Sequence, residues 1–363
     1  MPEPWKRLAR SAVRTSLRPT RVRKLVEAEL AGQRRARLAG EVNQDLVDRV
    51  FVDGSARRHE LDPALRNRLK PQWPVMCDPA AIARPPTDEA LADRARQAIG
   101  SVAEAVALVT TLGGSPFRGR LLEIGCYDGA IAFQLAGRPN SSVVASDLAR
   151  YYLVQEPGST GDQDMARKVA ELAALRSRAR TAGGQPGAEV EFVEDDITAS
   201  RLEPGSFDGI LSFEVLEHVA DPRGAFSSIA RLLRPGGITY HIYNPFFSVN
   251  GGHSLCTLDF PWGHTRLDPA DFERYLHEIR PAEAEQALRF YRESLNRMTL
   301  AGLRSSVDAA GLELLAVLPW ADRSLARQLR PEVMSEVQRV YPSAVAVDLL
   351  ATFVTLVARR SGP

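Results

Sequence analysis

Two carboxylates and one imidazole stand close together in the run Glu214-Val215-Leu216-Glu217-His218. Carboxylate oxygens and an imidazole nitrogen are ligands for a divalent cation, which can bind an acceptor hydroxyl and lower its pKa. The same imidazole can instead remove a proton as a general base. A third interpretation stays open, in which the two acids stand at a helix start and are favoured there by the helix dipole.

Two further histidines, His253 and His264, lie in an aromatic and glycine-rich stretch that follows a predicted strand ending at Tyr243. Nearby glycines permit the tight turns that would bring both imidazoles inward. Together with His218 they are the predicted general bases. His241 lies within the strand and is predicted to be structural.

A glycine-punctuated turn follows an apolar run that ends in the acid Glu123. Gly125 and Gly129 flank the turn, and a helical apolar pattern begins at Ile131. The pattern predicts a strand, a tight turn and a helix N-terminus, at which the backbone can approach a ligand closely. Tyr127 stands where the dinucleotide fingerprint has its second glycine, so that fingerprint is not met.

Acids also follow the next two predicted strands. Asp147 ends an apolar strand and lies 18 residues beyond Gly129, where a ribose-binding carboxylate is expected after a strand–helix–strand unit. Asp196 ends the third strand in the same way. The spacing predicts that both acids meet the glycine turn at one edge of a parallel sheet.

These features resemble the class I S-adenosylmethionine (SAM) methyltransferases. Glu123, Gly125 and Gly129 match that family's E/D-x-G-x-G-x-G motif, and Tyr127 departs from it. The run at 215–219 is close to the family's V-L-E-H-V signature, and residues 232–237 look like its L-x-P-G-G turn. The resemblance implies SAM as cofactor and a seven-stranded, mostly parallel Rossmann-like α/β sheet.

The resemblance also implies roles for individual residues. Asp147 would bind the ribose and Asp196 the adenine amino group. The E-x-x-E-H run looks like the metal-binding segment of small-RNA 2'-O-methyltransferases and ubiquinone-pathway O-methyltransferases. Any divalent metal would then be held by Glu214, Glu217 and His218, with another ligand available in His253 or His264. The predicted cofactor-binding residues are Glu123, Gly125, Tyr127, Gly129, Asp147, Leu148, Asp196, Ile197 and Phe213.

Two domains are expected: a basic, helical N-terminal extension over residues 1–100 and the methyltransferase domain over 101–363. A helix-rich insertion after the fifth strand, residues 245–297, is predicted to be a substrate lid. The last two strands are expected at 312–317 and 346–357. The predicted substrate-binding residues are Phe246, Phe247, Phe260, Trp262 and Tyr151.

Charge, cysteine content and hydropathy bear on the partners and the location of the protein. The net charge of +1 gives no global sign of a nucleic-acid partner, and the three cysteines form no C-x-x-C pair. No apolar run is long enough to span a bilayer and no signal peptide is recognisable, so a cytoplasmic location is expected. Residues 1–40 carry eleven Lys or Arg against three acids. This arm can bind RNA or a membrane surface, or be a solvated helical arm, which is the favoured interpretation.

Three functions remain. The leading hypothesis is a SAM-dependent methyltransferase that acts on a small molecule, at a hydroxyl oxygen, because an aromatic lid suits an enclosed substrate. The second is an RNA 2'-O-methyltransferase with a Glu/His-bound metal, although no RNA-binding module is recognised. The third is a non-catalytic or repurposed SAM-binding protein. The oligomeric state is left open.

Overall fold

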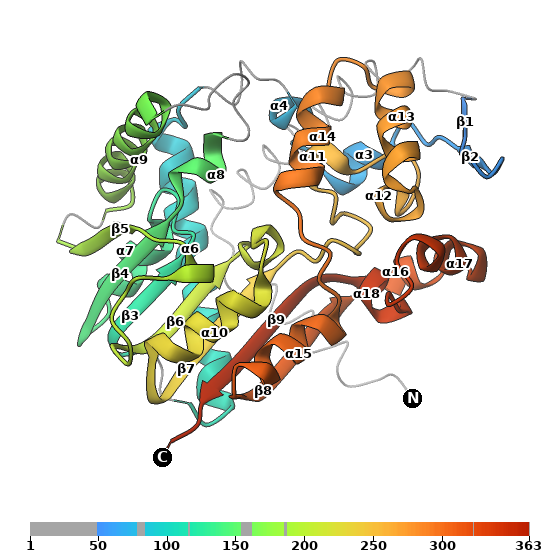
Figure 1. Cartoon of the computed structure of the whole chain (residues 1–363). Coiled ribbons are helices and arrows are strands. Elements are labelled where there is room, and N and C mark those ends of the chain that lie inside the picture. Colours follow the sequence, from blue (N-terminus) through green and yellow to red (C-terminus); the bar gives the residue numbers. More distant parts are fainter. Residues whose placement is uncertain are drawn as a thin grey trace, which may run out of the picture.

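The computed structural model of the 363-residue chain describes residues 49–77, 84–114, 117–153, 162–184, 187–321 and 323–362. The basic arm lies outside these residues, so the predictions about it are untested. Figure 1 shows a twisted sheet with helices on both faces and, beside it, a separate group of short helices. None of the helices in the described ranges has the length and apolar character needed to cross a bilayer.

The sheet has seven strands in the order β5-β4-β3-β6-β7-β9-β8. Neighbours among β3 to β7 run parallel, whereas β9 is antiparallel to both β7 and β8. This confirms the predicted mostly parallel α/β sheet. The strands are β3 (Gly119–Ile124), β4 (Ser141–Asp147), β5 (Val190–Glu194), β6 (Phe207–Phe213), β7 (Leu233–Tyr243), β8 (Leu312–Ala321) and β9 (Ala351–Arg360).

Both faces of the sheet are buried, which explains why its central strands are almost continuously apolar. Adjacent residues of β3 point to opposite faces: Leu121 packs with one apolar cluster and Leu122 with another. The first cluster includes residues of α6, and the second includes residues of α10 and α15. The flanking helices are α6 (Asp88–Thr111), α7 (Ala130–Ala136), α8 (Ala149–Leu153), α9 (Asp162–Ala182), α10 (Pro222–Leu232) and α15 (Leu300–Ala309).

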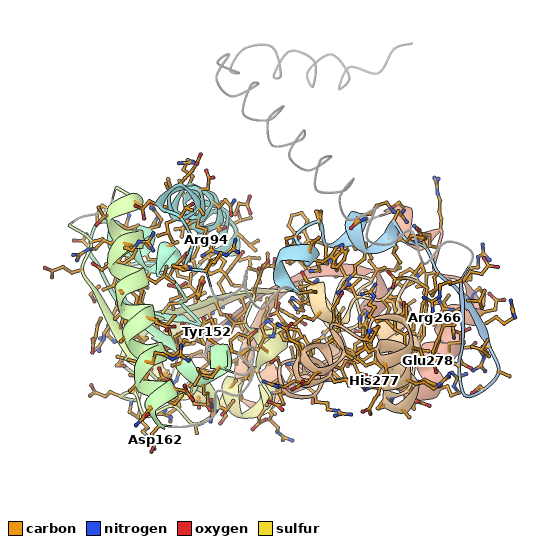
Figure 2. The ribbon with its side chains drawn as sticks, turned by 90° about the horizontal axis from the view of Figure 1, so that it is seen from above. Arg94, Tyr152, Asp162, Arg266, His277 and Glu278 are labelled. Carbon is orange, nitrogen blue, oxygen red and sulfur yellow. The ribbon has the colours of Figure 1, made fainter. Side chains whose placement is uncertain are left out.

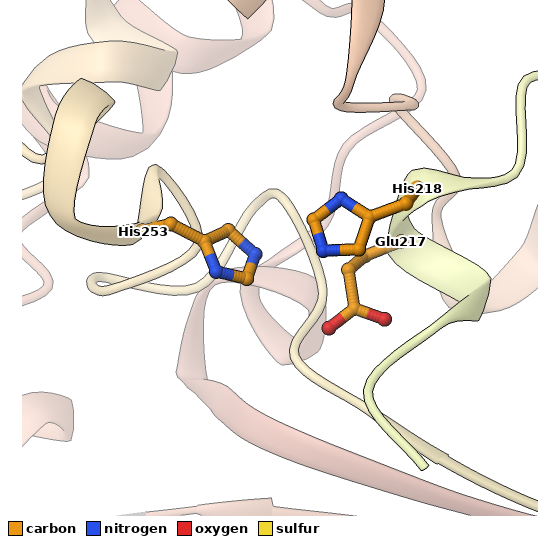
Figure 3. Close-up of side chains that lie close together, drawn as sticks. All are labelled: Glu217, His218 and His253. Atoms are coloured by element: carbon orange, nitrogen blue, oxygen red, sulfur yellow. The ribbon is translucent and has the colours of Figure 1, made fainter. Parts of the chain in front are cut away.

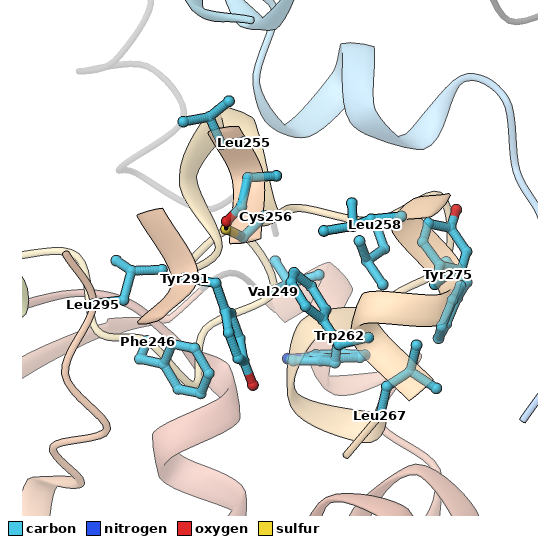
Figure 4. Packing of buried hydrophobic residues seen from close by; sticks show 14 of the residues in the cluster. Phe246, Val249, Leu255, Cys256, Leu258, Trp262, Leu267, Tyr275, Tyr291 and Leu295 are labelled. Carbon is cyan, nitrogen blue, oxygen red and sulfur yellow. Dashed lines mark hydrogen bonds between the residues drawn. The ribbon is translucent and has the colours of Figure 1, made fainter. Parts of the chain in front are cut away.

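We call the second body the cap and define it as residues 49–77, 245–297 and 323–350. These three segments share one apolar core, to which Phe51, Phe246 and Val337 each contribute, and Figure 4 shows part of it. The cap contains β1 (Val50–Val52), β2 (Arg58–Glu60), α3 (Leu65–Leu69), α4 (Trp73–Met76), α11 (His253–Cys256), α12 (Gly263–Arg266), α13 (Pro269–Ile279), α14 (Ala284–Glu293), α16 (Arg323–Ala326), α17 (Pro331–Val340) and α18 (Ala346–Leu350).

Hydrogen bonds also join the three segments of the cap. The Arg66 guanidinium donates to the Ser254 carbonyl at 2.7 Å and pairs with Glu283. The Trp262 indole N–H donates to the Leu349 carbonyl at 3.0 Å. Seen from above, Arg94 and Tyr152 lie with the sheet and its helices, while Arg266, His277 and Glu278 lie in the cap (Figure 2). The predicted lid is therefore one of three parts of the cap, and its role as a substrate lid stays a prediction.

One boundary differs from expectation. The strand predicted from residue 346 is wrong at its start, because Ala346–Leu350 is the helix α18 and β9 begins only at Ala351. The Asp348 carboxylate explains this, since it accepts the backbone N–H groups of Val345 and Leu300 and holds the turn. The division into two domains at residue 100, a position within helix α6, stays a prediction.

Buried His241 makes the stability of the sheet depend on pH. Its Nδ1 accepts from the Ser212 hydroxyl and its Nε2–H donates to Thr239, whose hydroxyl donates in turn to a backbone carbonyl. Burial lowers the pKa of His241 to about 3. The unfolded chain therefore binds the proton first, so stability is complete above pH 6.5 and is lost as the pH falls towards 3.

We predict that His241→Asn makes the free energy of unfolding less steeply dependent on pH between 6 and 4. The difference in slope from the native protein should approach about 1.4 kcal/mol per pH unit, which corresponds to one proton. Urea unfolding at several pH values measures it, with His277→Asn at an exposed position as the matched control. Equal slopes for the native protein and His241→Asn would contradict the prediction.

Candidate active site

The predicted site residues follow the carboxyl ends of neighbouring parallel strands. β3 pairs with β4 up to Ile124 and Ser146, and β6 pairs with β7 up to Phe213 and Ile242. These strand ends therefore lie at the same edge of the sheet, where open α/β sheets bind ligands.

The turn after β3 has the backbone that its glycine pattern predicts. Gly125 has φ +72° and Gly129 has φ +80°, both in the left-handed region. A Cβ at Gly125 would lie 2.4 Å from the Val215 side chain, so this position also needs the small residue. Tyr127 has φ +44°, a conformation that favours glycine. Tyr127 stands at the motif's middle glycine position and still adopts a backbone conformation that favours glycine.

Asp147, the predicted ribose acid, is buried at the end of β4 and is 6% exposed. Its Oδ2 accepts the backbone N–H of Tyr127 at 2.9 Å and the Arg176 guanidinium at 3.1 Å. The Tyr152 hydroxyl donates to the same carboxylate at 3.1 Å. Burial raises the pKa of Asp147, while these partners oppose the shift. Two ribose hydroxyls would have to displace the Tyr152 hydroxyl to reach both oxygens.

Two other predicted cofactor acids occupy different surroundings. Glu123 lies beneath the turn, and its Oε2 is buried without a hydrogen-bond partner. Burial, with Asp128 and Asp147 nearby, raises the pKa of Glu123 well above its usual value. Asp196 caps the short 3-10 helix η2 (Ile197–Ala199) through the Thr198 N–H and pairs with Arg150.

Three side chains meet after β6 and β7 (Figure 3). One potential ligand atom from each of Glu217, His218 and His253 lies within 4.8 Å of the other two, the one such group among the described residues. Glu217 and His218 belong to the 3-10 helix η3 (Leu216–His218), and His253 opens α11 with φ +55°. We call these three residues the triad.

Each member of the triad has an atom available for a ligand. The Glu217 Oε1 accepts the Asn244 N–H at 3.0 Å, while its Oε2 is buried without a partner. His218 Nδ1–H donates to the Ser294 carbonyl at 2.6 Å, which leaves Nε2 as the unprotonated nitrogen. The Nε2 of His253 is also buried without a partner.

Burial determines the charge of the triad. It raises the pKa of Glu217 to about 8, lowers that of His218 to about 4 and lowers that of His253 well below the usual value. Both imidazoles are therefore neutral near pH 7, which is the form that binds metal ions. The Lys70 ammonium interacts electrostatically with Glu217, and burial lowers the pKa of Lys70.

A series of ring contacts runs from Tyr127 in the glycine turn to the triad. The ring centroids of Tyr127 and Tyr152 are 5.3 Å apart, as are those of Tyr152 and Tyr151. Tyr151 then lies 5.1 Å from His218, which lies 5.0 Å from His253. Tyr151, a predicted substrate contact, therefore stands between the triad and Tyr152, which bonds the predicted ribose acid Asp147.

Other predicted residues lie elsewhere. Glu214 is exposed at φ +56° and does not belong to the triad. His264 is fully buried and bonds the Phe246 carbonyl at 2.7 Å. The remaining predicted positions are the half-buried Leu148 and Phe213 near the strand ends, the buried Ile197, and four aromatic residues in the cap core: Phe246, Phe247, Phe260 and Trp262. Direct substrate contact by those four stays a prediction.

Sequence reasoning missed three residues that shape the site. Arg176 bonds Asp147, Lys70 interacts electrostatically with Glu217, and the Asn244 N–H donates to the Glu217 carboxyl. Asn244 had a local signal, because it directly follows the predicted fifth strand. Arg176 and Lys70 come from segments that the fold brings near, so no spacing rule would find them. Tyr152, which with Tyr151 was expected to touch adenine or substrate, bonds Asp147.

Asn296 fastens η3 in place. Its side-chain amide donates to the carbonyls of Leu216 and Val219 at 2.6 and 2.8 Å, and its backbone N–H donates to the Glu217 carbonyl. We predict that Asn296→Ala lowers the free energy of unfolding by about 2–3 kcal/mol, because two carbonyls lose their partner. Urea unfolding measures the change, and exposed Gln97→Ala is the control. A loss no larger than the control's would show that η3 does not need this amide.

Comparisons of the chain with protein families, curated proteins and solved structures all find methyltransferases. Residues 122–241 match the family model described as "Methyltransferase domain". The chain is 30% identical over 181 residues to the ubiquinone biosynthesis O-methyltransferase of Paracidovorax citrulli, which covers 49% of this chain and 64% of that protein. It is 34% identical over 170 residues to that of Xanthomonas campestris pv. campestris (strain B100), covering 47% and 60%.

The chain thus spans less than two thirds of the length of these relatives. Among solved structures, it is similar to one described as a sarcosine dimethylglycine methyltransferase from Galdieria sulphuraria, with 13% identity and a TM-score of 0.40 over 73% of this chain and 86% of that one. The family match covers residues 122–241, which form the strands β3 to β7, and it supports a methyltransferase domain in this part of the chain.

Proposed function

We propose that this protein transfers the methyl group of SAM to a hydroxyl oxygen of a small molecule. The observation that carries the proposal is the triad, a buried acid and two neutral imidazoles at the same sheet edge as Asp147 and the glycine turn. The relatives named ubiquinone biosynthesis O-methyltransferases support oxygen as the acceptor atom.

The residues at the sheet edge suit SAM. Asp147 can accept hydrogen bonds from ribose hydroxyls once the Tyr152 hydroxyl is displaced. Asp196 follows the next strand, where its carboxylate can accept from the adenine amino group. Gly125 and Gly129, both at positive φ, shape the turn whose backbone would face the methionine portion. SAM, when bound, supplies a methyl group on a positively charged sulfur. The contribution of the chain is to hold the acceptor oxygen in line with that methyl.

The triad suits a divalent cation. Two imidazole nitrogens and one carboxylate oxygen form a common catalytic ligand set, which leaves a position open for substrate. The partnerless Oε2 of Glu217 and Nε2 of His253 are the atoms that such an ion would satisfy. The ion, when bound, would lower the pKa of an acceptor hydroxyl. Without an ion, the low pKa of His218 makes it a weak base near pH 7.

The acceptor class is tested by supplying labelled SAM to the purified protein with either a small-molecule extract or bulk RNA. Label transferred only to the extract supports the proposal. Transfer to RNA favours the alternative 2'-O-methyltransferase. SAM binding without transfer to either favours a repurposed SAM-binding protein.

We predict that Asp147→Asn weakens SAM binding roughly 10–150-fold, the equivalent of one charge-assisted hydrogen bond. Isothermal titration calorimetry measures the change. Asp208→Asn is the control, because Asp208 pairs with Arg234 at the amino end of β6, away from the site. Unchanged affinity of Asp147→Asn would remove Asp147 from the ribose site.

We predict that Glu217→Gln weakens the binding of Mn²⁺ or Zn²⁺ by more than about 100-fold, since losing a ligand should exceed the loss of an outer-shell partner. Glu214→Gln is the matched control, and it should bind like the native protein because Glu214 lies outside the triad. Calorimetry on chelator-treated protein tests both variants. If Glu214→Gln is the variant that loses the ion, the ligand set predicted from the sequence is the better one.

A further inference from the structure

We propose that Arg176 is a positioning residue for the cofactor turn, where it holds Tyr127 in a conformation that the family motif assigns to glycine. Arg176 lies on α9, in the segment between β4 and β5, outside every motif recognised in the sequence. The inference rests on the proposed function in one respect, namely that Asp147 binds the ribose of SAM.

Both backbone polar groups of Tyr127 are engaged by one ion pair. The Tyr127 N–H donates to Asp147 Oδ2 at 2.9 Å, and the Tyr127 carbonyl accepts from Arg176 Nε at 2.9 Å. Arg176 also donates from its terminal nitrogen to the same Asp147 oxygen at 3.1 Å, so the three residues are joined in a ring of hydrogen bonds. With its two peptide groups fastened in this way, Tyr127 is held at φ +44°.

The arginine is itself fixed in position. Its side chain is 12% exposed, and its guanidinium lies 4.7 Å from the centre of the Phe192 ring on β5. Arginine presents Nε and a terminal nitrogen as a rigid planar fork, which can serve a carbonyl and a carboxylate together. A lysine at this position offers a single flexible ammonium group and cannot reproduce that fork.

The ring of Tyr127 is held from two other sides. The guanidinium of Arg94 on α6 lies 5.1 Å from its centre, and Tyr152 lies on it at 5.3 Å. Arg94 also pairs with Asp128, the next residue of the turn, at 3.0 Å. A glycine at this position would need none of these contacts, because it adopts positive φ without steric cost. The dependence on Arg176 therefore follows from the tyrosine.

A double-mutant cycle tests this dependence. Arg176→Met, Tyr127→Gly and the double variant are compared with the native protein by calorimetric titration with SAM. We expect Arg176→Met to weaken SAM binding at least about tenfold and Arg176→Lys to restore only part of the affinity. We expect the Arg176→Met effect to be at least about threefold smaller in the Tyr127→Gly background, because glycine needs no support there. Arg178→Met, which removes an exposed arginine of the same helix, should bind SAM normally.

Amide hydrogen exchange in the ligand-free protein gives a second measurement that needs no SAM. Arg176→Met should speed exchange at residues 125–129, and Arg178→Met should not. Faster exchange in Arg176→Met supports the inference even if the native protein binds no SAM. A failure of the native protein to bind SAM would refute the proposed function but not the role of Arg176. Unchanged exchange, or an equal loss of affinity in the native and Tyr127→Gly backgrounds, would overturn the role of Arg176 in holding the turn.

Discussion

The buried carboxyl group of Glu217 is the constraint on which the site depends. Its side chain is fully buried, and burying a carboxylate without partners is strongly unfavourable. The Asn244 N–H at the end of β7 donates to one oxygen, and one carboxylate oxygen lies within 4.8 Å of a nitrogen of each imidazole. The raised pKa of Glu217 reflects the unfavourable free energy of burying its charged form, which a bound cation would offset. The 3-10 helix, Asn296 and the start of the cap are arranged around this one group.

The sheet and the glycine turn could be predicted because their signals are local. Apolar strands ending in Glu123 or Asp147 and glycines at 125 and 129 report directly on backbone geometry, and the structure has that geometry. The triad could be predicted only in part. Glu217 and His218 are adjacent in the sequence, but His253 replaces Glu214 because the chain turns at Glu214 and leaves that carboxylate exposed.

The aromatic residues of the cap show a different limit. A run of phenylalanine, tryptophan and glycine has the same composition whether it lines a substrate site or fills a core. Phe246 and Trp262 are almost completely buried. Phe246 packs against the Tyr341 ring, and the Trp262 indole donates to the Leu349 carbonyl, so both are covered by residues from distant parts of the sequence. Lys70 reaches the triad for the same reason. Contacts between segments so far apart in the chain produce no periodic pattern, so they could not be predicted from the sequence.

The three-part cap also has a consequence for the order in which the protein is made. Phe51 is synthesised 286 residues before Val337, yet the two side chains end in one core. At a translation rate of 5–20 residues per second, roughly 15–60 s pass between them. During that interval the apolar face of β1 lacks its final cover, and so do the Trp262 indole and its neighbours. The seven-stranded sheet faces the same delay, since β9 is the last of its strands to be made and must enter between β7 and β8. Until then the nascent chain exposes apolar surface, the condition under which folding chains are prone to aggregate.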